Sequence, residues 1–306
     1  MFGKLTRIAT GNLGRPRLSA DGSTVVYTRW NGKDWDIERH RNGEMEAVSK
    51  HPGQDTAPYV SDDGEVVVWS RMDPESGNWD VMRWQDRQET AVANSPANEM
   101  EPHISGDGQT VVYTYDDPDK TTGFDIHICD SNGCRELTSG GPVDREALVA
   151  DNGKRVIFRR KVRFDGGDLW IHDENGTVKP FTHDGLSEQR TAISGDAKRV
   201  AWSKSLDGEN EDIYLRDLAT GEEHLIGLPD FNERDPILSS DGSLLAFSRS
   251  GRGESNIILW QDGRETAVTD GGHNSWPDIS DDGSVVTWAA VDPEDSSQRV
   301  VFKLER

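Results

Sequence analysis

The sequence predicts an all-β fold, a seven-bladed β-propeller in which each blade has four antiparallel strands. Two observations predict it: one segment recurs seven times, and short β-rich runs joined by tight turns fill each repeat. Each recurring segment reads apolar–Ser–x–Asp–Gly and continues into a run that ends in an aromatic residue. A repeat of about 44 residues that holds four strands is typical of a propeller blade.

Three columns of residues keep a fixed spacing in all seven copies. The turn column consists of Asp21, Asp63, Asp107, Asn152, Asp196, Asp241 and Asp282. The aliphatic column, three positions earlier, consists of Leu18, Val60, Ile104, Val149, Ile193, Leu238 and Ile279. The aromatic column, six positions after the turn, consists of Tyr27, Trp69, Tyr113, Phe158, Trp202, Phe247 and Trp288. We expect the aromatic side chains to pack between neighbouring sheets.

The four strands of a repeat follow in order, here called strands a to d. Asp-Gly between two apolar runs favours a hairpin, so it joins strand a to strand b. Strand c opens with a polar and an aliphatic residue: Asp36-Ile37, Asp80-Val81, Asp125-Ile126, Asp168-Leu169, Asp212-Ile213 and Asn256-Ile257. A second hairpin, such as Asn42-Gly43, Asn175-Gly176 or Asp262-Gly263, leads to strand d.

The last copy ends after its strand c, and the first is preceded by KLTRIATG, which has the character of a strand d. We therefore expect residues 3–10 to complete the seventh blade, which would leave no long edge strand. Residues 1–306 then form a single domain. The expected blades span residues 11–50, 51–94, 95–139, 140–183, 184–228, 229–270, and 271–306 together with 3–10.

Charge and hydropathy exclude two classes of partner. The chain has 34 Lys and Arg against 56 Asp and Glu, a formal charge of −22, which argues against nucleic acid. No apolar run approaches the roughly 18 residues that a membrane span needs. The N-terminal residues show no signal-peptide pattern, which leaves the compartment open: periplasmic or secreted if a leader was removed, and otherwise cytoplasmic. We expect a monomer.

Several segments carry a family resemblance. They are Pro102-His103-Ile104-Ser105-Gly106-Asp107-Gly108, Asp212-Ile213-Tyr214 and Leu137-Thr138. With them the chain resembles the TolB-type, WD-repeat-like β-propeller repeat family, over essentially its whole length. The resemblance implies the propeller fold and no particular activity. The chain departs from TolB itself in having seven copies instead of six, and no Pro inside the Ser-x-Asp-Gly turn.

A column of acidic residues stands eight positions ahead of the turn column. Its members are Leu13, Asp55, Glu99, Asp144, Glu188, Glu233 and Asn274. Equivalent positions before strand a lie at the channel mouth, so Asp55, Glu99, Asp144, Glu188 and Glu233 predict an acidic ring. Mutual repulsion makes a hard cation such as Ca²⁺, or a basic group, its physical complement. The alternative is that each carboxylate accepts backbone N–H groups of its own or the next blade.

Aromatic residues gather in the loops between strands b and c of the first four repeats: Trp30, Trp35, Trp79, Phe124 and Phe164. They predict a platform for a sugar or peptide on one side of the mouth. The alternative is that Trp35, Trp79 and Phe124 only cover the ends of their blades. His51, His103, His183 and His273 lie on the same side, and a histidine-bound metal would require several of them to converge.

Cys129 and Cys134 are the two cysteines, in ICDSNGC. They face each other and can form a disulfide if Asp130 to Gly133 make the hairpin loop. If Asn132-Gly133 make a two-residue turn instead, Cys134 pairs with Ser131 and no bond forms. An oxidised pair would indicate an exported protein.

These observations lead to one functional hypothesis and one alternative. The hypothesis is a non-enzymatic recognition propeller whose acidic mouth holds a cation or a basic group of a protein, peptide or glycan ligand. Its ligand residues are the acidic column with Asn274, and Trp30, Trp35, Trp79 and Phe124. The alternative is a carbohydrate-active enzyme, a lyase or glycoside hydrolase, that uses mouth carboxylates as acid and base together with the loop aromatics.

Overall fold

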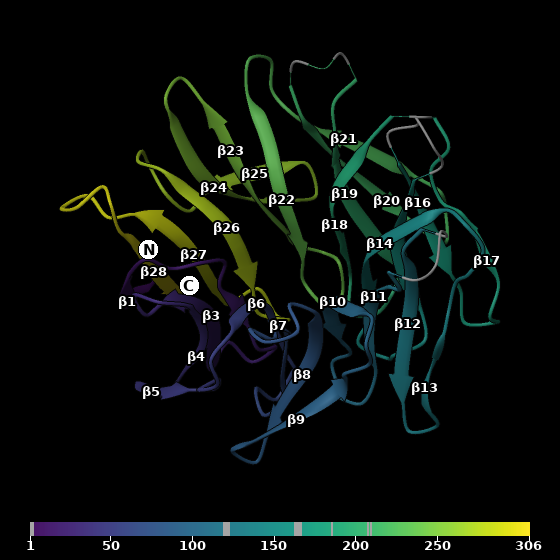
Figure 1. Ribbon diagram of the computed structural model, residues 1–306. Coiled ribbons are helices and arrows are strands. Elements are labelled where there is room, and N and C mark those ends of the chain that lie inside the picture. The colour runs from purple at the N-terminus through teal and green to yellow at the C-terminus, as the bar shows by residue number, and fades with distance from the viewer. Residues whose placement is uncertain (1–2, 119–122, 162–166, 185, 207, 209) are drawn as a thin grey trace. The chain divides into compact units, whose positions relative to one another are not determined.

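The computed structural model describes residues 3–118, 123–161, 167–184, 186–206, 208 and 210–306. None of these residues is helical, and their strands form seven four-stranded antiparallel sheets, here numbered as blades one to seven (Figure 1). The predicted fold class, an all-β seven-bladed propeller with four strands per blade, is confirmed.

The strands of each blade follow one another along the chain, except in blade seven. Blade one consists of β2 (Arg17–Leu18), β3 (Thr24–Trp30), β4 (Trp35–Arg41) and β5 (Glu44–Ala47). Blade two consists of β6 (Gln54–Val60), β7 (Val67–Met72), β8 (Trp79–Gln85) and β9 (Gln88–Ala93). Blade three consists of β10 (Asn98–Ile104), β11 (Val111–Asp116), β12 (Asp125–Asp130) and β13 (Gly133–Glu136). Blade four consists of β14 (Val143–Val149), β15 (Val156–Lys161), β16 (Asp168–His172) and β17 (Val178–Pro180). Blade five consists of β18 (Glu188–Ile193), β19 (Arg199–Lys204), β20 (Asp212–Asp217) and β21 (Glu223–Ile226). Blade six consists of β22 (Asn232–Leu238), β23 (Leu245–Gly251), β24 (Glu254–Gln261) and β25 (Arg264–Ala267). Blade seven consists of β26 (Asn274–Ile279), β27 (Val285–Val291), β28 (Arg299–Glu305) and β1 (Lys4–Gly11).

The chain divides into two compact units. The first unit comprises Met1–Val25 and Glu188–Arg306, and it contains blades five to seven. The second unit comprises Val26–Ser187 and contains blades two to four. The single-domain organisation expected from the sequence stays a prediction.

Blade seven is completed by β1, as the sequence predicts. This strand pairs antiparallel with β28 from Lys4↔Glu305 to Gly11↔Arg299, with one irregularity between Arg7 and Ala9. The hydrogen-bonding edge of β28 is therefore covered by a strand from the other end of the chain.

The recurring turn has the same chemistry wherever Ser and Asp are both present. In blade two, Ser61 Oγ donates to Asp63 Oδ1 at 2.6 Å, and the same oxygen accepts the N–H of Glu65 at 2.9 Å. Gly64 has a φ of 71°, a left-handed conformation that glycine adopts without steric cost. The side chain thus stabilises the hairpin that the Asp-Gly pair predicts.

The aromatic column is buried, which confirms the predicted strand register. Its seven side chains are at most 4% exposed. In the second unit, Trp69 packs with Val26 and Ile37, so residues of blades one and two share one apolar cluster. In the first unit, Phe247 of blade six packs with Ile213 of blade five in the same way.

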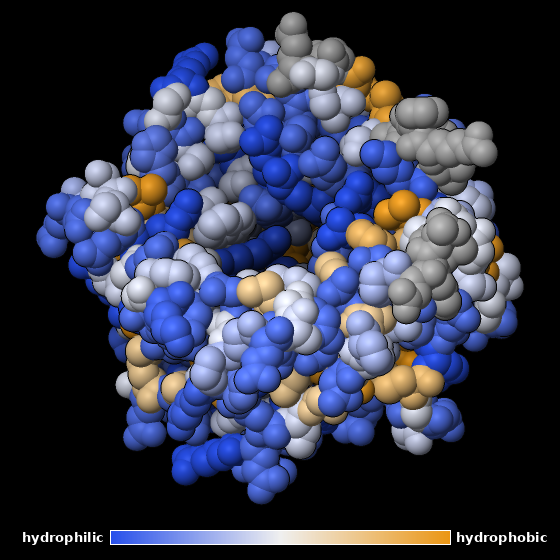
Figure 2. Space-filling model, viewed as in Figure 1, coloured by the Kyte–Doolittle hydropathy of each residue, from blue (hydrophilic) through white to orange (hydrophobic). Residues whose placement is uncertain are grey.

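The loop residues carry the polar surface. Figure 2 shows hydrophilic side chains over most of one face, with apolar residues scattered among them. The described part of the chain forms no helix that could span a membrane.

A disulfide joins Cys129 of β12 to Cys134 of β13, with Cα atoms 4.0 Å apart. The two residues are direct partners in the strand register, and Asp130 pairs with Gly133 at the hairpin end. Of the two registers considered from the sequence, the one with the cysteines facing each other is therefore observed.

Candidate functional site

The acidic column lies inside the blades, where strand b supplies its partners. Asp55 is fully buried, and its Oδ1 accepts hydrogen bonds from Trp69 Nε1 at 2.9 Å and Arg71 Nε at 2.8 Å. Arg71 Nη2 reaches the second oxygen at 3.1 Å. Burial raises the pKa of Asp55, and the Arg71 guanidinium opposes that rise. The carboxylate is therefore held by its own blade.

The same arrangement recurs in blades four, five and six. Arg160 donates to both oxygens of Asp144, at 2.7 and 2.6 Å, and Arg249 Nε lies 2.5 Å from Glu233 Oε1. Lys204 Nζ is 3.9 Å from Glu188 Oε1. Each cation is the register partner of its acid. Unpaired charges are expensive to bury, so these cations explain how the carboxylates are accommodated.

Glu99 and Asn274, the other two polar members of the column, have no such cation among the described residues. Glu99 is paired in register with Tyr115, and its carboxylate accepts hydrogen bonds from the side chain and N–H of Ser95. Burial raises the pKa of Glu99. Asn274 accepts from Trp288 Nε1 at 3.0 Å and donates to two backbone carbonyls at 2.9 Å.

This geometry favours a structural role for the acidic column, although the partners are side chains of the same blade as well as backbone groups. The metal and ligand roles predicted for Asp55, Glu99, Asp144, Glu188, Glu233 and Asn274 stay predictions. The sequence does hold the missing signal: two residues after the aromatic column stand Arg29, Arg71, Tyr115, Arg160, Lys204, Arg249 and Ala290. Five of these seven residues are cationic.

Strand a carries a β-bulge in blades two to seven, two residues after the acidic column. The bulged residues have φ values of 47° to 57°: Ala57, Glu101, Glu146, Arg190, Asp235 and Trp276. The strand register shifts beside each of them. A bulge places two residues opposite one and redirects their side chains. No residue pattern in the sequence predicts these bulges.

The structure brings Trp30 and Trp35 together at the end of blade one. Their ring centroids are 5.7 Å apart and the ring planes are tilted by 60°. Trp30 is 36% exposed, which is unusual for so large an apolar side chain. These two predicted ligand residues therefore form one aromatic surface at the β3–β4 hairpin, here called the Trp30–Trp35 pair.

The hairpin loop beneath the pair is held by Asn31. Its Oδ1 accepts the N–H groups of Lys33 at 2.8 Å and Asp34 at 3.0 Å, and its Nδ2 donates to Asp36 Oδ2 at 2.7 Å. Asp34 also accepts a hydrogen bond from the Asn31 amide. Burial raises the pKa of Asp36, and the neighbouring Asp34 acts in the same direction. The two carboxylates that flank Trp35 in the sequence are therefore both bound by the Asn31 amide.

The other predicted aromatic residues lie on separate blades. Trp79 begins β8, is partly buried, and its N–H donates to Asn98 Oδ1 at 3.1 Å. Phe124 precedes β12, and the guanidinium carbon of Arg145 lies 5.0 Å from its ring centroid. Phe164 lies outside the described residues. The ligand roles predicted for Trp79 and Phe124 stay predictions, as does the alternative that they cover the ends of their blades.

Histidine does not form a metal centre within the described residues. No histidine there belongs to a group of three or more potential ligands that lie close together. His51 Nδ1 is 2.8 Å from the carbonyl of Pro52, and the His103 ring contacts Tyr59 with centroids 4.4 Å apart.

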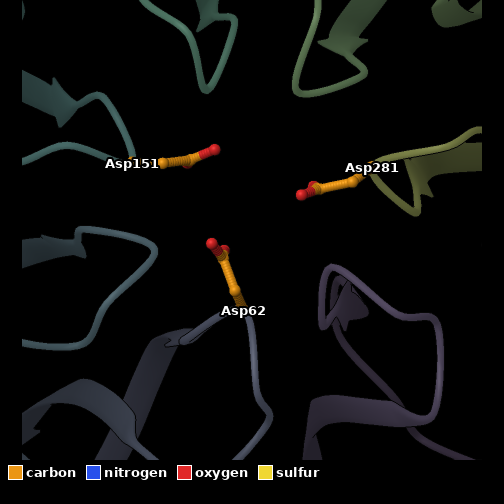
Figure 3. Close-up of side chains that lie close together, drawn as sticks. All are labelled: Asp62, Asp151 and Asp281. Carbon is orange, nitrogen blue, oxygen red and sulfur yellow. The ribbon is translucent and has the colours of Figure 1, made fainter.

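A pair of carboxylates that the sequence analysis did not single out occurs in the second unit. Asp62 and Asp151 occupy the x position of their Ser-x-Asp-Gly turn or its equivalent, and their carboxylate oxygens lie within 4.8 Å of each other. Figure 3 shows these two side chains extending toward each other from their turns, and Asp281 in the equivalent turn of blade seven. Gly106 lies beside Asp62, and the lack of a side chain there is needed, because a Cβ would lie only 2.1 Å from Asp62 Oδ2. Such acidic groups could hold a metal ion, of a kind that the residues do not specify.

Comparison with known proteins supports the fold. No family model matches the chain, and no curated protein matches it in sequence. An oligogalacturonate lyase in complex with manganese is similar in structure, with a TM-score of 0.75, 13% identity, and coverage of 99% of this chain and 93% of that one. The β-propeller domain of the Trilobed protease from Pyrococcus furiosus has a TM-score of 0.71 at 14% identity, covering 97% and 96%.

TolB from Acinetobacter baumannii is similar over 88% of this chain and 66% of its own, with a TM-score of 0.58 and 19% identity. TolB-like propellers are thus among the structural neighbours, as the resemblance of the repeats implies. Lyase, protease and TolB share this architecture, so the likeness describes the fold and leaves binding and catalysis undecided.

Proposed function

We propose that the protein is a non-enzymatic recognition propeller, and that the Trp30–Trp35 pair binds a basic side chain of a peptide or protein partner. The observation that carries the proposal is the exposed aromatic pair on a loop whose nearest acids are Asp34 and Asp36. An aromatic face attracts a lysine or arginine cation, and an adjacent carboxylate strengthens that attraction.

Charge supports a basic partner. The net charge of −22 attracts cations over long range and raises the rate of encounter. Lys33 is paired with one of these acids, with Nζ 3.9 Å from Asp34 Oδ2, and its side chain is 79% exposed. A surface pair of this length contributes little, so a ligand cation can replace it.

The acidic column supports recognition over catalysis. An acid–base pair for glycoside or uronide chemistry needs two carboxylates that can reach the substrate. Asp55, Asp144 and Glu233 are buried and each is bound by an arginine. The similarity to an oligogalacturonate lyase is one of fold, at 13% identity. We therefore do not propose the carbohydrate-active alternative.

A binding titration tests the proposal. An oligolysine peptide is titrated into the wild type and into Trp30→Ala, with calorimetry as the measurement. We expect the wild type to bind, and the substitution to weaken binding about five- to tenfold, which corresponds to roughly 1 kcal/mol for a cation–π contact. Trp30→Phe, which keeps an aromatic face, should retain most of the affinity.

Two substitutions that each remove one negative charge distinguish binding at the Trp30–Trp35 pair from attraction by the net charge of the protein. Asp36→Asn should lower the affinity for the oligolysine peptide. Asp86→Asn, which makes the same charge change at the exposed β8–β9 turn, should leave that affinity unchanged. Equal affinities for the wild type, Trp30→Ala and Asp36→Asn would contradict the proposal. Trp30-dependent binding of a neutral oligosaccharide instead of oligolysine would identify a sugar platform.

A further inference from the structure

A chain of ion pairs links three arginines and two carboxylates in the first unit. Arg190 lies between the acids, with Nη1 2.8 Å from Glu211 Oε2 and Nε 3.5 Å from Asp235 Oδ1. Arg234 Nη2 is 3.0 Å from Glu211 Oε1, and Arg15 Nη1 is 3.9 Å from Asp235 Oδ1. These five residues are here called the arginine cluster.

The cluster is built by the bulges of strand a. Arg190 in β18 and Asp235 in β22 are bulged residues, with φ values of 47° and 53°. The bulge in β22 lets the adjacent Arg234 and Asp235 reach different partners, Glu211 and Arg190. Arg15 comes from the segment before β2. With Glu211, which precedes β20, side chains from four separate parts of the chain are thereby brought into contact.

The arginines have more donors than the cluster uses. A guanidinium carries five N–H groups. Arg15 is paired with Asp235 at 3.9 Å and its charge also acts on Asp278, but its Nε is buried without a hydrogen-bond partner among the described residues. Arg234 Nε is likewise buried without a partner there. Unsatisfied buried donors are costly, so an added acceptor would be stabilising.

The charge balance points to an anion. The neighbouring pair, Arg17 and Asp278, has Nη1 and Oδ2 3.9 Å apart. Counted over these ion pairs of the described residues alone, four arginines face three carboxylates, which leaves one positive charge. Arg15, Arg190 and Arg234 have side chains 31%, 34% and 40% exposed, so a ligand can reach them. This local excess contrasts with the net charge of −22.

We propose that the arginine cluster binds an oxyanion, the carboxylate or phosphate group of a small ligand, with Arg15 and Arg234 as the principal donors. Guanidinium forks match both groups and bind them with charge-assisted hydrogen bonds. Arg190 contacts both Glu211 and Asp235, which orients the two acids. This site is independent of the Trp30–Trp35 pair, and the test of one does not decide the other.

Three probes test the proposal by calorimetry at constant ionic strength: inorganic phosphate, galacturonate and galactose. The last two differ by a carboxylate. We expect phosphate or galacturonate to bind the wild type and galactose not to bind. Phosphate alone would identify a phosphate ligand, and galacturonate alone a carboxylate ligand. Failure of both anions to bind, or equal binding of galactose, would overturn the proposal.

Substitutions of single arginines test whether the anion binds at the arginine cluster. Arg15→Gln and Arg234→Gln should each lower the affinity for the anion about tenfold, as expected for the loss of one charge-assisted hydrogen bond. Both leave Arg190 to pair with Glu211 and Asp235, so neither acid is stranded. Arg264→Gln, the same charge change at an exposed position of blade six, is the control and should bind like the wild type.

A conservative variant keeps the test decisive if a glutamine variant unfolds. Arg234→Lys preserves the charge and removes the fork, so it should fold and bind the anion more weakly than the wild type. Unchanged binding in Arg15→Gln, Arg234→Gln and Arg234→Lys would place the anion elsewhere and overturn the assignment.

Discussion

Arg160 donates two parallel hydrogen bonds to Asp144, from Nε to Oδ1 at 2.7 Å and from Nη2 to Oδ2 at 2.6 Å. The two residues are register partners on β14 and β15, and Asp144 is 1% exposed. The guanidinium carbon of Arg160 also lies 4.4 Å from the ring centroid of Trp170, which is within the range of a cation–π contact. The pair therefore fixes strand a to strand b inside the blade.

Removing one partner of this pair should destabilise the protein strongly. We expect Asp144→Asn to lower the free energy of unfolding by about 3 kcal/mol, because Arg160 would keep a buried charge without its counterion. Denaturant unfolding measures the loss. Glu146→Gln, which breaks the more exposed pair with Arg159 in the same blade, should cost less than about 1 kcal/mol. Equal losses would mean that Asp144 is not a buried ion-pair residue.

Glu99 should give a stability gain that depends on pH when it is replaced by Gln. Burial raises the pKa of Glu99 in the folded protein, so the folded state binds a proton more tightly than the unfolded chain does. Wild-type stability therefore falls as the pH rises from the unfolded pKa through the folded one. Glu99→Gln removes that loss, so its advantage should be present at neutral pH and shrink in acid. Denaturation midpoints across this range measure it, and an advantage that grew in acid would contradict the burial argument.

Calcium should not act through the acidic column. Arg71, Arg160 and Arg249 already neutralise three of its carboxylates, so the column has little capacity for a further cation. We expect any dependence of the melting temperature on Ca²⁺ to be the same in the wild type and in Glu99→Gln. A rise with Ca²⁺ that Glu99→Gln abolished would establish the metal site that the sequence predicts.

The strand β1 should be needed for a stable blade seven. Deleting residues 3–10 removes the partner of β28 and exposes its edge. We expect a lower melting temperature, and partial recovery when a synthetic peptide of the deleted sequence is added, because a free edge accepts an added strand. A truncated chain that melts like the wild type would show that β1 contributes nothing to stability.

The sequence was sufficient for the fold because the repeat fixes both the strand order and the buried face. Trp69 and Trp202 lie where the seven-fold column predicts, each at most 1% exposed. The acidic column was expected before strand a, at the channel mouth, whereas Asp55, Glu99 and Asp144 lie within strand a and are buried. Its partners were missed because Asp55 and Arg71 are 16 residues apart and meet only through the strand pairing.

The candidate sites were harder to predict for a related reason. A β-bulge such as that at Arg190 changes the direction in which the side chains project. The bulged positions hold residues of several types, so residue type does not predict the bulge. The contact between Trp30 and Trp35 depends on the hydrogen bonds that Asn31 makes within the loop. Sequence spacing indicated the aromatic cluster but could not separate the pair from Trp79.

The pairing of Lys4 with Glu305 has a consequence for how the protein folds. These residues are far apart in the sequence, so blade seven cannot be completed until both β1 and β28 have been synthesised. Closing so long a loop costs entropy that local hairpins do not face, and contacts of this range slow folding. Blades whose four strands are consecutive in the sequence can form early. Until β1 pairs, the sheet of β26 to β28 has an unpaired edge at β28. The joining of β1 to β28 is thus expected to be a late step, and nascent or truncated chains are most prone to aggregation before it occurs.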